Sequence, residues 1–555
     1  MLGIDAFLEI LAKAGVRHIF GNPGSTELPL NDALVADDRF QYIFGLQEVP
    51  LTAMADGYAM ASGTPGIVCV HICCGLGNSM GMLYNAHCEG TPLMILAGQQ
   101  DRRLRFEDPV LAGDMVAAAS PWTKWAVEVQ RAEDVPNAVR RALQTALTPP
   151  TGPVFLSLPV DLQLERVENL DLTPPHIPDR RVRPPLDALR RAADILVQAS
   201  NPAILAGSRV TEADGIGELT ALAETLGATV LAESTASHGR RPMPADHPLY
   251  AGALSMWSPD VRQRLEEFDV LFAVGLDMLR LYIYREPARP LPEHIRLLHL
   301  DADPWQLGKN YPLEVGLVGD PKAGLGELAQ LVAEIIPPER VQISEERHKA
   351  AVTRRATEQQ ELLAEIEAQR NQRPMTHLTF VEAICRSLPP DVAVVEEAMT
   401  THQNLLTRLG VPADPTGLFG HRGWALGWGL GCAIGVKLAW PERPVVALLG
   451  DGSALYGIQG LWTAAHHHIP VTFVIANNAQ YRILKMGGEI MQLPQMAKKN
   501  YLGMDLVDPE IDFVNLARSF GVQAHQVTEP DELDEQMRAS LQQSEPTLLD
   551  VRIER

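Results

Sequence analysis

The chain has 555 residues, which is too long for one hydrophobic core, and a length of ~150 residues per domain predicts three or four domains. Its composition, with 46% apolar and 21% charged residues, is typical of a soluble globular protein. The net charge of −22 disfavours nucleic acid and anionic membrane as partners because both are polyanions, and the chain lacks the run of about 18 uncharged apolar residues that a membrane span needs.

The N-terminal segment has the pattern of a helix. Residues 1–16, MLGIDAFLEILAKAGV, contain Asp5 and Glu9 and lack a basic start, so we expect the first amphipathic helix of the fold rather than a signal peptide. The six cysteines stand in apolar or glycine-rich surroundings and do not repeat as CxxC pairs. This usage predicts reduced thiols in a cytoplasmic protein and no structural zinc.

Apolar runs of strand length alternate with helical patterns along the chain. These runs lie at 66–72, 92–98, 152–159, 202–208, 270–275, 296–303, 392–397, 444–450 and 471–478. Buried strands that alternate with helices predict parallel sheets with both faces covered. We therefore expect an α/β protein with doubly wound domains and mostly parallel sheets.

Two stretches interrupt this alternation and divide the chain. Residues 164–187 are rich in proline and charge, which predicts a linker. Residues 337–374 are charged and helix-forming, which predicts an exposed helical connector. The chain is thereby predicted to form three domains, at 1–165, 186–336 and 374–555.

The segment 444–478 places polar side chains at the ends of two neighbouring strands. Asp451 follows the run PVVALLG, residues 453–468 read as a helix, and the run VTFVIANN ends at Asn478. In open α/β sheets, ligands collect at the carboxyl ends of strands, and a helix N-terminus suits an anion such as phosphate. One carboxylate and one amide oxygen suit Mg²⁺ or Ca²⁺, so we expect Asp451 and Asn478 to share one ion.

The sequence GDG at 450–452, followed by twenty-four residues and NN at 477–478, resembles the signature of thiamine-diphosphate-dependent enzymes. The resemblance covers almost the whole chain and points to the superfamily of 2-oxo acid decarboxylases and acetolactate synthases. It implies a pyrimidine-binding, a central and a diphosphate-binding domain, in this order. It also implies thiamine diphosphate, with Mg²⁺ (or Ca²⁺) held by Asp451, Asn478 and the carbonyl of Gln480. The alternative is a structural turn and an unrelated Asn pair.

The same resemblance implies further contacts to the cofactor. Leu426 would lie under the cofactor and force its two rings into a V shape, and the carbonyl of Trp424 would accept a hydrogen bond from its 4′-amino group. The other residues assigned to cofactor binding are Met399, Thr400, Gly450, Gly452, Ser453 and Ile483. Ile483 would also face the substrate together with Leu484, and Gly487 stands where the benzoylformate branch of the family has a large aromatic residue.

Glu48, in QEVPLTAMADGYA, matches the E…AxGYA pattern of the family's N-terminal domain. The resemblance implies a carboxyl group beside the cofactor's pyrimidine ring, where it helps to remove the proton from C2 of the thiazolium. The alternative is a glutamate that only stabilises a helix N-terminus. In this family the glutamate and the diphosphate site come from different subunits, which implies at least a homodimer and favours a homotetramer.

Within the superfamily, the chain resembles benzoylformate decarboxylases most. In GNPGSTELP, Ser25 would bind the substrate carboxylate, although a turn or helix cap is the alternative. In CVHICCGLGNSMG, His71 occupies the position of a catalytic histidine that relays protons, although a satisfied core histidine is the alternative. A second catalytic histidine of that branch is replaced by Tyr282, or by Tyr284 in a shifted alignment. A phenol is a poor proton shuttle at pH 7, and the alternative is that both tyrosines only pack.

Two further motifs are not expected to bind ligands. His466, His467 and His468 are consecutive, so on a helix they point in different directions and cannot chelate a metal well. The GxGxxxG pattern of Gly75, Gly77 and Gly81 departs from the dinucleotide fingerprint and lacks its acidic partner.

The leading hypothesis is a thiamine-diphosphate- and Mg²⁺-dependent carboxy-lyase. It would decarboxylate a 2-oxo acid, benzoylformate-like or branched aliphatic, without oxidation, to an aldehyde and CO₂, with Glu48, His71, Ser25 and Tyr282 at the reacting centre. The alternative is an acetolactate-synthase-like or acyloin carboligase, and such relatives sometimes carry FAD in the central domain. A minor alternative is a cofactor-binding protein without catalysis.

Overall fold

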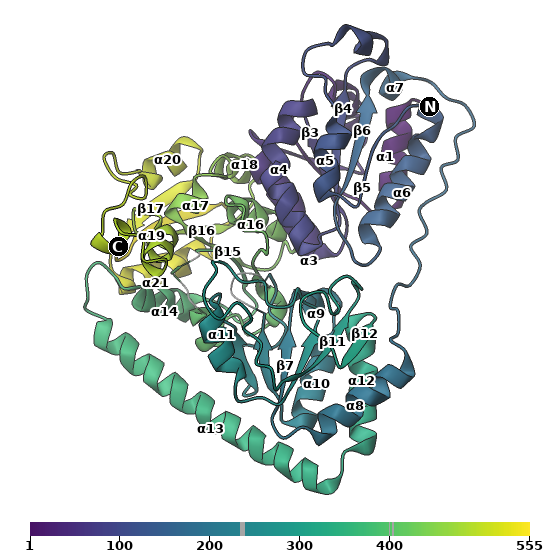
Figure 1. Ribbon diagram of the computed structural model, residues 1–555. Helices are drawn as coiled ribbons and strands as arrows, with labels where there is room; N and C mark the ends of the chain where they lie inside the picture. Colours follow the sequence, from purple (N-terminus) through teal and green to yellow (C-terminus); the bar gives the residue numbers. More distant parts are fainter. Residues whose placement is uncertain (234–238, 399, 402–403) are drawn as a thin grey trace.

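A computed structural model of the chain describes residues 1–233, 239–398, 400–401 and 404–555 and contains three α/β domains (Figure 1). Each domain is built on one sheet of six strands, and every pair of neighbouring strands is parallel. Each sheet lies inside one of the three ranges that the sequence predicts. The predicted fold class is confirmed.

The N-terminal domain has the strand order β2-β1-β3-β4-β6-β5. Its strands are β1 (His18–Gly21), β2 (Gln41–Phe44), β3 (Gly66–Val70), β4 (Leu93–Gln99), β5 (Trp125–Glu128) and β6 (Val154–Pro159). Its helices are α1 (Gly3–Lys13), α2 (Leu28–Val35), α3 (Glu48–Ser62), α4 (Ile72–Glu89), α5 (Met115–Ala119), α6 (Val135–Leu147) and α7 (Val160–Leu164). The amphipathic helix predicted at the N-terminus is α1, and the predicted linker follows α7.

The middle domain has the strand order β12-β11-β10-β7-β8-β9. Its strands are β7 (Pro202–Ala206), β8 (Thr229–Ala232), β9 (Tyr250–Ala253), β10 (Val270–Val274), β11 (Arg296–Asp301) and β12 (Val315–Val318). Its helices are α8 (Leu186–Gln198), α9 (Ser208–Glu212), α10 (Ile216–Leu226), α11 (Ser258–Leu265) and α12 (Pro321–Ile335).

The C-terminal domain has the strand order β14-β13-β15-β16-β18-β17, so its connections reverse direction between β13 and β15. Its strands are β13 (Ala393–Glu397), β14 (Leu418–Phe419), β15 (Val445–Gly450), β16 (Thr472–Asn477), β17 (Gln523–Val527) and β18 (Thr547–Arg552). Its helices are α14 (His377–Ser387), α15 (Leu405–Arg408), α16 (Trp428–Ala439), α17 (Asp451–Ala454), α18 (Gly460–His466), α19 (Arg482–Ile490), α20 (Phe513–Ser519) and α21 (Pro530–Ser540). A ligand is expected where such a reversal opens a crevice at the carboxyl ends of the strands.

The single helix predicted over 453–468 is wrong, because the structure divides it into α17 and α18. The turn between them packs against Gly427, whose carbonyl oxygen lies 2.5 Å from where a Cβ on Gly457 would stand. A continuous helix over 453–468 would lose this contact between the turn and the loop that precedes α16. His466 ends α18, and His467 accepts a hydrogen bond from the Phe44 N–H through Nε2 at 2.9 Å.

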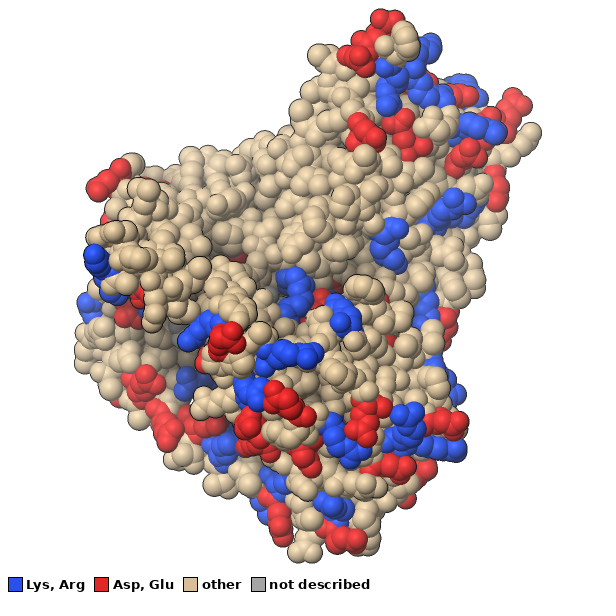
Figure 2. Space-filling view, viewed as in Figure 1, with Lys and Arg blue, Asp and Glu red and all other residues tan. Residues whose placement is uncertain are grey.

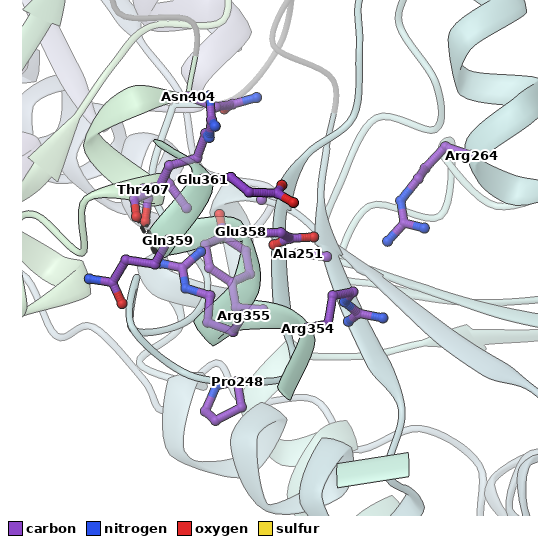
Figure 3. A pocket seen from close by; sticks show the side chains of 13 residues that line it. Pro248, Ala251, Arg264, Arg354, Arg355, Glu358, Gln359, Glu361, Asn404 and Thr407 are labelled. Atoms are coloured by element: carbon purple, nitrogen blue, oxygen red, sulfur yellow. Dashed lines mark hydrogen bonds between the residues drawn. The ribbon is translucent and has the colours of Figure 1, made fainter. Parts of the chain in front are cut away.

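The connector predicted at 337–374 is the long helix α13 (Pro338–Gln369), which runs along the outside of the molecule from the middle to the C-terminal domain (Figure 1). Arg355 of α13 donates to the carbonyl oxygens of Ala245 at 2.9 Å and Thr407 at 2.8 Å. Figure 3 shows Arg355 beside Thr407, at the edge of a cavity of about 450 Å³ between the two domains. The helix therefore ties the middle domain to the C-terminal domain.

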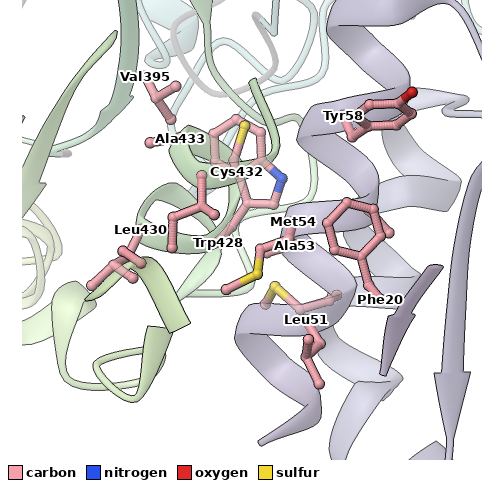
Figure 4. Packing of buried hydrophobic residues seen from close by; sticks show 14 of the residues in the cluster. Phe20, Leu51, Ala53, Met54, Tyr58, Val395, Trp428, Leu430, Cys432 and Ala433 are labelled. Atoms are coloured by element: carbon pink, nitrogen blue, oxygen red, sulfur yellow. The ribbon is translucent and has the colours of Figure 1, made fainter. Parts of the chain in front are cut away.

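The N- and C-terminal domains are joined by the packed helices α3 and α16, whose buried side chains Leu51, Met54, Trp428 and Cys432 meet in Figure 4. Glycines allow this close approach, because a Cβ on Gly435 would lie 1.9 Å from the carbonyl oxygen of Met54. At the centre of the contact, the Trp428 indole N–H donates to the Asp56 carboxyl at 2.6 Å. Asp56 is buried, and burial raises its pKa to about 7.

The raised pKa of Asp56 predicts a pH-dependent stability. The pKa of this carboxyl is ~3.9 in the unfolded chain and about 7 in the folded protein. Between these pH values only the unfolded chain releases the proton, so the free energy of unfolding falls as the pH rises. We expect Asp56→Asn to gain about 1.4 kcal/mol of stability per pH unit relative to the native protein between pH 5 and pH 7. Urea unfolding at several pH values measures this, with exposed Asp391→Asn as the control. An equal difference at pH 5 and pH 8 would contradict the buried, protonated acid.

In the part of the chain that the structure describes, no helix has both the length and the apolar character that crossing a membrane requires. Figure 2 shows acidic and basic side chains mixed over the middle domain. The face over α4 and α18 of the neighbouring domains is nearly free of charged side chains in the same view.

Candidate functional site

The carboxyl ends of β15 and β16 bring Asp451 and Asn478 together. Gly450 pairs with Ala476 across the two strands, so the residues that follow them leave the sheet at one edge. The Asp451 carboxylate accepts hydrogen bonds from the N–H groups of Gly452 at 2.7 Å and Ala479 at 2.6 Å. Burial raises the pKa of Asp451 to about 6. The turn after β16 is thereby folded onto the carboxylate.

The same turn carries the third predicted metal ligand, Gln480. Its N–H donates to the Asn478 side-chain oxygen at 3.2 Å, and both residues are buried. Carboxylate, amide and main-chain oxygens are the donors that Mg²⁺ and Ca²⁺ prefer. The donor set therefore fits the divalent cation that the resemblance implies.

A cavity of about 190 Å³ opens beside these oxygens. Of the residues predicted for the site, those that line it are Tyr282, Thr400, Trp424, Leu426, Gly450, Asp451, Gly452, Ser453, Asn478, Gln480 and Ile483. The structure thus gathers residues far apart in the sequence around one space. Met399, which was also predicted, lies outside the described residues.

Glu397 lines this cavity too and was missed by the sequence analysis. It ends β13, and its carboxylate accepts hydrogen bonds from the N–H groups of Gly427 at 2.9 Å, Trp428 at 3.0 Å and Gly429 at 3.0 Å. It therefore holds the start of α16 against the sheet. Glu397 could have been predicted from the sequence, because it is an acidic residue at the end of a buried apolar run. Its strand, β13, lies next to β15, which ends just before Asp451.

The loop that carries Trp424 and Leu426 is held by helix α4 of the N-terminal domain. The side-chain amide of Asn85 donates to the Ala425 carbonyl oxygen at 2.8 Å and accepts from the Ala425 N–H at 3.0 Å. A Cβ on Gly423 would lie 2.3 Å from the Asn85 side-chain oxygen, so only glycine fits there. Arg422 reinforces the contact through the Glu89 carboxylate, 3.3 Å away.

Removing this contact should weaken cofactor binding. We expect Asn85→Ala to raise the dissociation constant of thiamine diphosphate by roughly ten- to thirtyfold, because two part-buried main-chain groups lose hydrogen bonds worth about 1 kcal/mol each. Asn85→Asp should lie in between, since it still accepts from the Ala425 N–H. Quenching of tryptophan fluorescence during cofactor titration measures the change, with surface Asn137→Ala as control. Unchanged cofactor affinity in Asn85→Ala would show that the loop keeps its shape without these two hydrogen bonds.

Glu48 is buried at the start of α3. Its carboxyl accepts a hydrogen bond from the Asn78 side chain at 2.9 Å, and a Cβ on Gly75 would lie 2.9 Å from its other oxygen. The glycine-rich start of α4 therefore makes room for Glu48, which explains the GLGN sequence without a dinucleotide site. Asn78 was not predicted, although it lies in that motif.

His71 lies between β3 and α4, and its Nδ1 is 2.7 Å from the Glu27 carboxylate. The other Glu27 oxygen accepts from the Gly98 N–H at 2.7 Å. The side chain of His71 is 22% exposed, so it is neither fully buried nor free to rotate. Ser25 is exposed on the loop that precedes Glu27. Glu27, two residues after the predicted Ser25, was missed because only the fold brings it to His71.

The N-terminal residues Glu48, His71 and Ser25 do not line the cavity beside Asp451, whose walls come from the middle and C-terminal domains. Tyr282 is the middle-domain contribution, and its ring centroid lies 4.9 Å from that of Trp424. Tyr284 is 69% exposed and bonds to the Glu286 carboxylate instead. Of the two tyrosines, it is Tyr282 that faces the candidate site.

The crevice of the middle sheet, between β7 and β10, is filled by charged side chains of the protein. Arg209 donates to the Asp277 carboxylate at 2.8 Å and lies 3.0 Å from the buried Asp301. Ser208 bonds to the buried Glu233 at 2.9 Å. The charged side chains at this crevice are thus paired with other groups of the protein.

Comparison with known proteins matches all three domains. Models of thiamine pyrophosphate enzymes match at 1–111 (N-terminal TPP binding domain), 189–328 (central domain) and 399–551 (C-terminal TPP binding domain). Benzoylformate decarboxylase of Pseudomonas aeruginosa is 32% identical, with 99% of this chain and 98% of that protein covered. Acetolactate synthase isozyme 3 large subunit of Escherichia coli is 28% identical, with 98% and 92% covered. The solved structure of a thiamine diphosphate-dependent 4-hydroxybenzoylformate decarboxylase from Rhodococcus jostii has a TM-score of 0.87 and 28% identity, with 100% and 99% covered.

Proposed function

Because the chain belongs to the thiamine pyrophosphate enzyme family, we propose that it decarboxylates a 2-oxo acid to an aldehyde and CO₂, without oxidation, using thiamine diphosphate and Mg²⁺. The observation that carries the proposal is the meeting of Asp451, Asn478 and Gln480 beside the cavity. The benzoylformate decarboxylases among its relatives support a substrate of this class. Membership of a family of enzymes removes the alternative of a non-catalytic binding protein.

Asp451, Asn478 and the Gln480 carbonyl would hold the metal ion, and Gly452 and Ser453 would lie against the diphosphate. The cofactor, when bound, supplies the electron sink that lets a 2-oxo acid lose CO₂. Leu426 and Trp424 would support its ring system, and their loop is kept in place by Asn85.

The protein's own proton-handling groups are Glu48 and His71. Asn78 holds one oxygen of Glu48, which leaves the other for the cofactor's pyrimidine ring. Glu27 holds Nδ1 of His71, so Nε2 is the atom that can take or give a proton at the substrate. Ser25, on the neighbouring loop, would bind the substrate carboxylate.

We propose that the complete site forms between two copies of the chain, at least in a homodimer and in a homotetramer by family analogy. Glu48 and His71 are absent from the cavity wall of their own chain, so a second copy would have to supply them. The nearly uncharged face over α4 and α18 in Figure 2 is suited to such a contact, because charged residues are depleted in the core of interfaces.

A second candidate is carboligation, in which the product carbon is joined to another carbonyl compound. Tyr282 favours it, because a phenol in place of a histidine would slow protonation and aldehyde release. The acetolactate synthases among the relatives are consistent with this outcome.

One experiment tests both candidates. The protein loaded with thiamine diphosphate and Mg²⁺ is offered a panel of 2-oxo acids, and CO₂ and organic products are measured by mass spectrometry. Aldehyde is expected from decarboxylation alone, and acyloins or 2-hydroxy-2-alkyl acids in the presence of an acceptor indicate carboligation. Absence of CO₂ across the panel would overturn the proposal.

A further inference from the structure

A second cavity, of about 210 Å³, lies next to the cofactor cavity and is named here the tail compartment. It is lined by Tyr282 and Ile283 of the middle domain, by one side of α19 and by the segment that follows α19. The lining includes Met491, Met496 and Met504, and among the described residues it contains no charged side chain. Such a surface is suited to an apolar group and offers nothing to bind a charge.

The tail compartment adjoins the proposed active site. Tyr282, Ile483 and Leu484 line both cavities, so these three side chains form the partition between them. A ligand whose reacting end lies beside Asp451 reaches the compartment only with atoms that extend past this partition.

Two consecutive glycines of α19 leave this space open. A Cβ on Gly488 would lie 1.8 Å from Met496 Sδ, and a Cβ on Gly487 would lie 3.2 Å from Ile283 Cδ1. Both glycines also line the compartment. Larger side chains at these positions would therefore fill it.

Because the compartment lies beyond this partition, a group that reaches it must be elongated as well as apolar. The compartment is a groove open to solvent, since Met491 on its wall is 53% exposed, and its volume exceeds the ~150 Å³ of an apolar cavity that holds a benzene ring. Methionine side chains are unbranched and flexible, so they adapt to a chain that has no fixed shape.

We propose that the tail compartment receives the unbranched apolar side chain of the substrate, about six carbons or longer, so that the enzyme acts on medium-chain 2-oxo acids. This inference rests on the proposed function, because it places the 2-oxo carboxylate in the cofactor cavity. It differs from the benzoylformate-like and branched substrates that the family resemblance implies.

The test compares the holoenzyme's kcat/KM for 2-oxooctanoate, pyruvate, 3-methyl-2-oxobutanoate and benzoylformate. Burial of one methylene is worth on the order of threefold, so 2-oxooctanoate should exceed pyruvate by about two orders of magnitude. It should also exceed the branched and aromatic acids. Equal or lower values for 2-oxooctanoate would overturn the proposal, whatever the cause.

A matched pair of variants locates the effect. Gly487→Phe fills the compartment from a residue with ordinary helical geometry and should lower kcat/KM for 2-oxooctanoate at least thirtyfold while leaving pyruvate within about threefold. Leu502→Phe adds the same ring to a side chain that is 93% exposed and should change neither value. If Gly487→Phe does not fold, Met491→Glu tests the same point, since Met491 is 53% exposed and tolerates a polar group. Unchanged 2-oxooctanoate turnover in whichever of these two variants folds would overturn the proposal.

A binding measurement separates the failure of this inference from the failure of the proposed function. Octanoate has the same tail and no 2-oxo group, so its binding to the holoenzyme, measured by calorimetry, does not require turnover. Binding in the native protein that is lost in Gly487→Phe supports the compartment even if no 2-oxo acid is decarboxylated. Turnover of short 2-oxo acids without octanoate binding would overturn the compartment and leave decarboxylation standing.

Discussion

Glu48→Gln is expected to lower turnover by roughly two orders of magnitude or more, in line with the loss of a positioned acid–base group. The amide is nearly isosteric, so it still occupies the space above Gly75 and beside Asn78. Cofactor binding should persist, because the residues proposed to hold the metal and the diphosphate lie in the C-terminal domain. Steady-state kinetics and a cofactor titration on the same preparation measure the two effects separately.

The control for this variant is Glu107→Gln, which makes the same chemical change at an exposed position of the same domain. It should have native kinetics and native cofactor affinity. Near-native turnover in Glu48→Gln would mean that Glu48 does not activate the cofactor and that the N-terminal domain is not the pyrimidine-binding half.

Asp451→Ala is expected to show the opposite pattern, with cofactor affinity reduced by more than about 100-fold. Loss of a residue that only supports a metal ligand typically costs 10–100-fold, and Asp451 is proposed to contact the metal itself. The carboxylate also accepts hydrogen bonds from the N–H groups of Gly452 and Ala479, so its removal should loosen the turn that carries Asn478. Calorimetric titration with thiamine diphosphate at fixed Mg²⁺ measures the loss, and high concentrations of both should restore activity only in part.

Asp391→Ala, an exposed change at the opposite end of the same sheet, is the control and should bind cofactor normally. Coexpression of Asp451→Ala with Glu48→Gln then tests the shared site. In a mixed dimer one site receives both native residues, so random pairing should return about a quarter of the native activity. No recovery would contradict a site built from two chains.

Local sequence determined the fold class and one end of the site. Long buried runs such as those ending at Val70, Gly450 and Asn477 were visible because a strand covered on both faces must be continuously apolar. Asp451 and Asn478 were predictable because each follows such a run, and adjacent parallel strands end at one edge. The strand β1 was not recognised because it has only four residues, and β17 because three of its five residues are exposed and polar, so neither forms a continuous apolar run.

Only the tertiary structure decided how these pieces are held and what else surrounds them. Glu27 meets His71 across 44 positions, Asn85 meets Ala425 across 340, and Asp56 meets Trp428 across 372. Such pairs leave no local pattern, because their partners are chosen by the packing of whole domains rather than by helix or strand period. The tail compartment belongs to this class too, since its walls come from two domains and its volume depends on how their side chains pack.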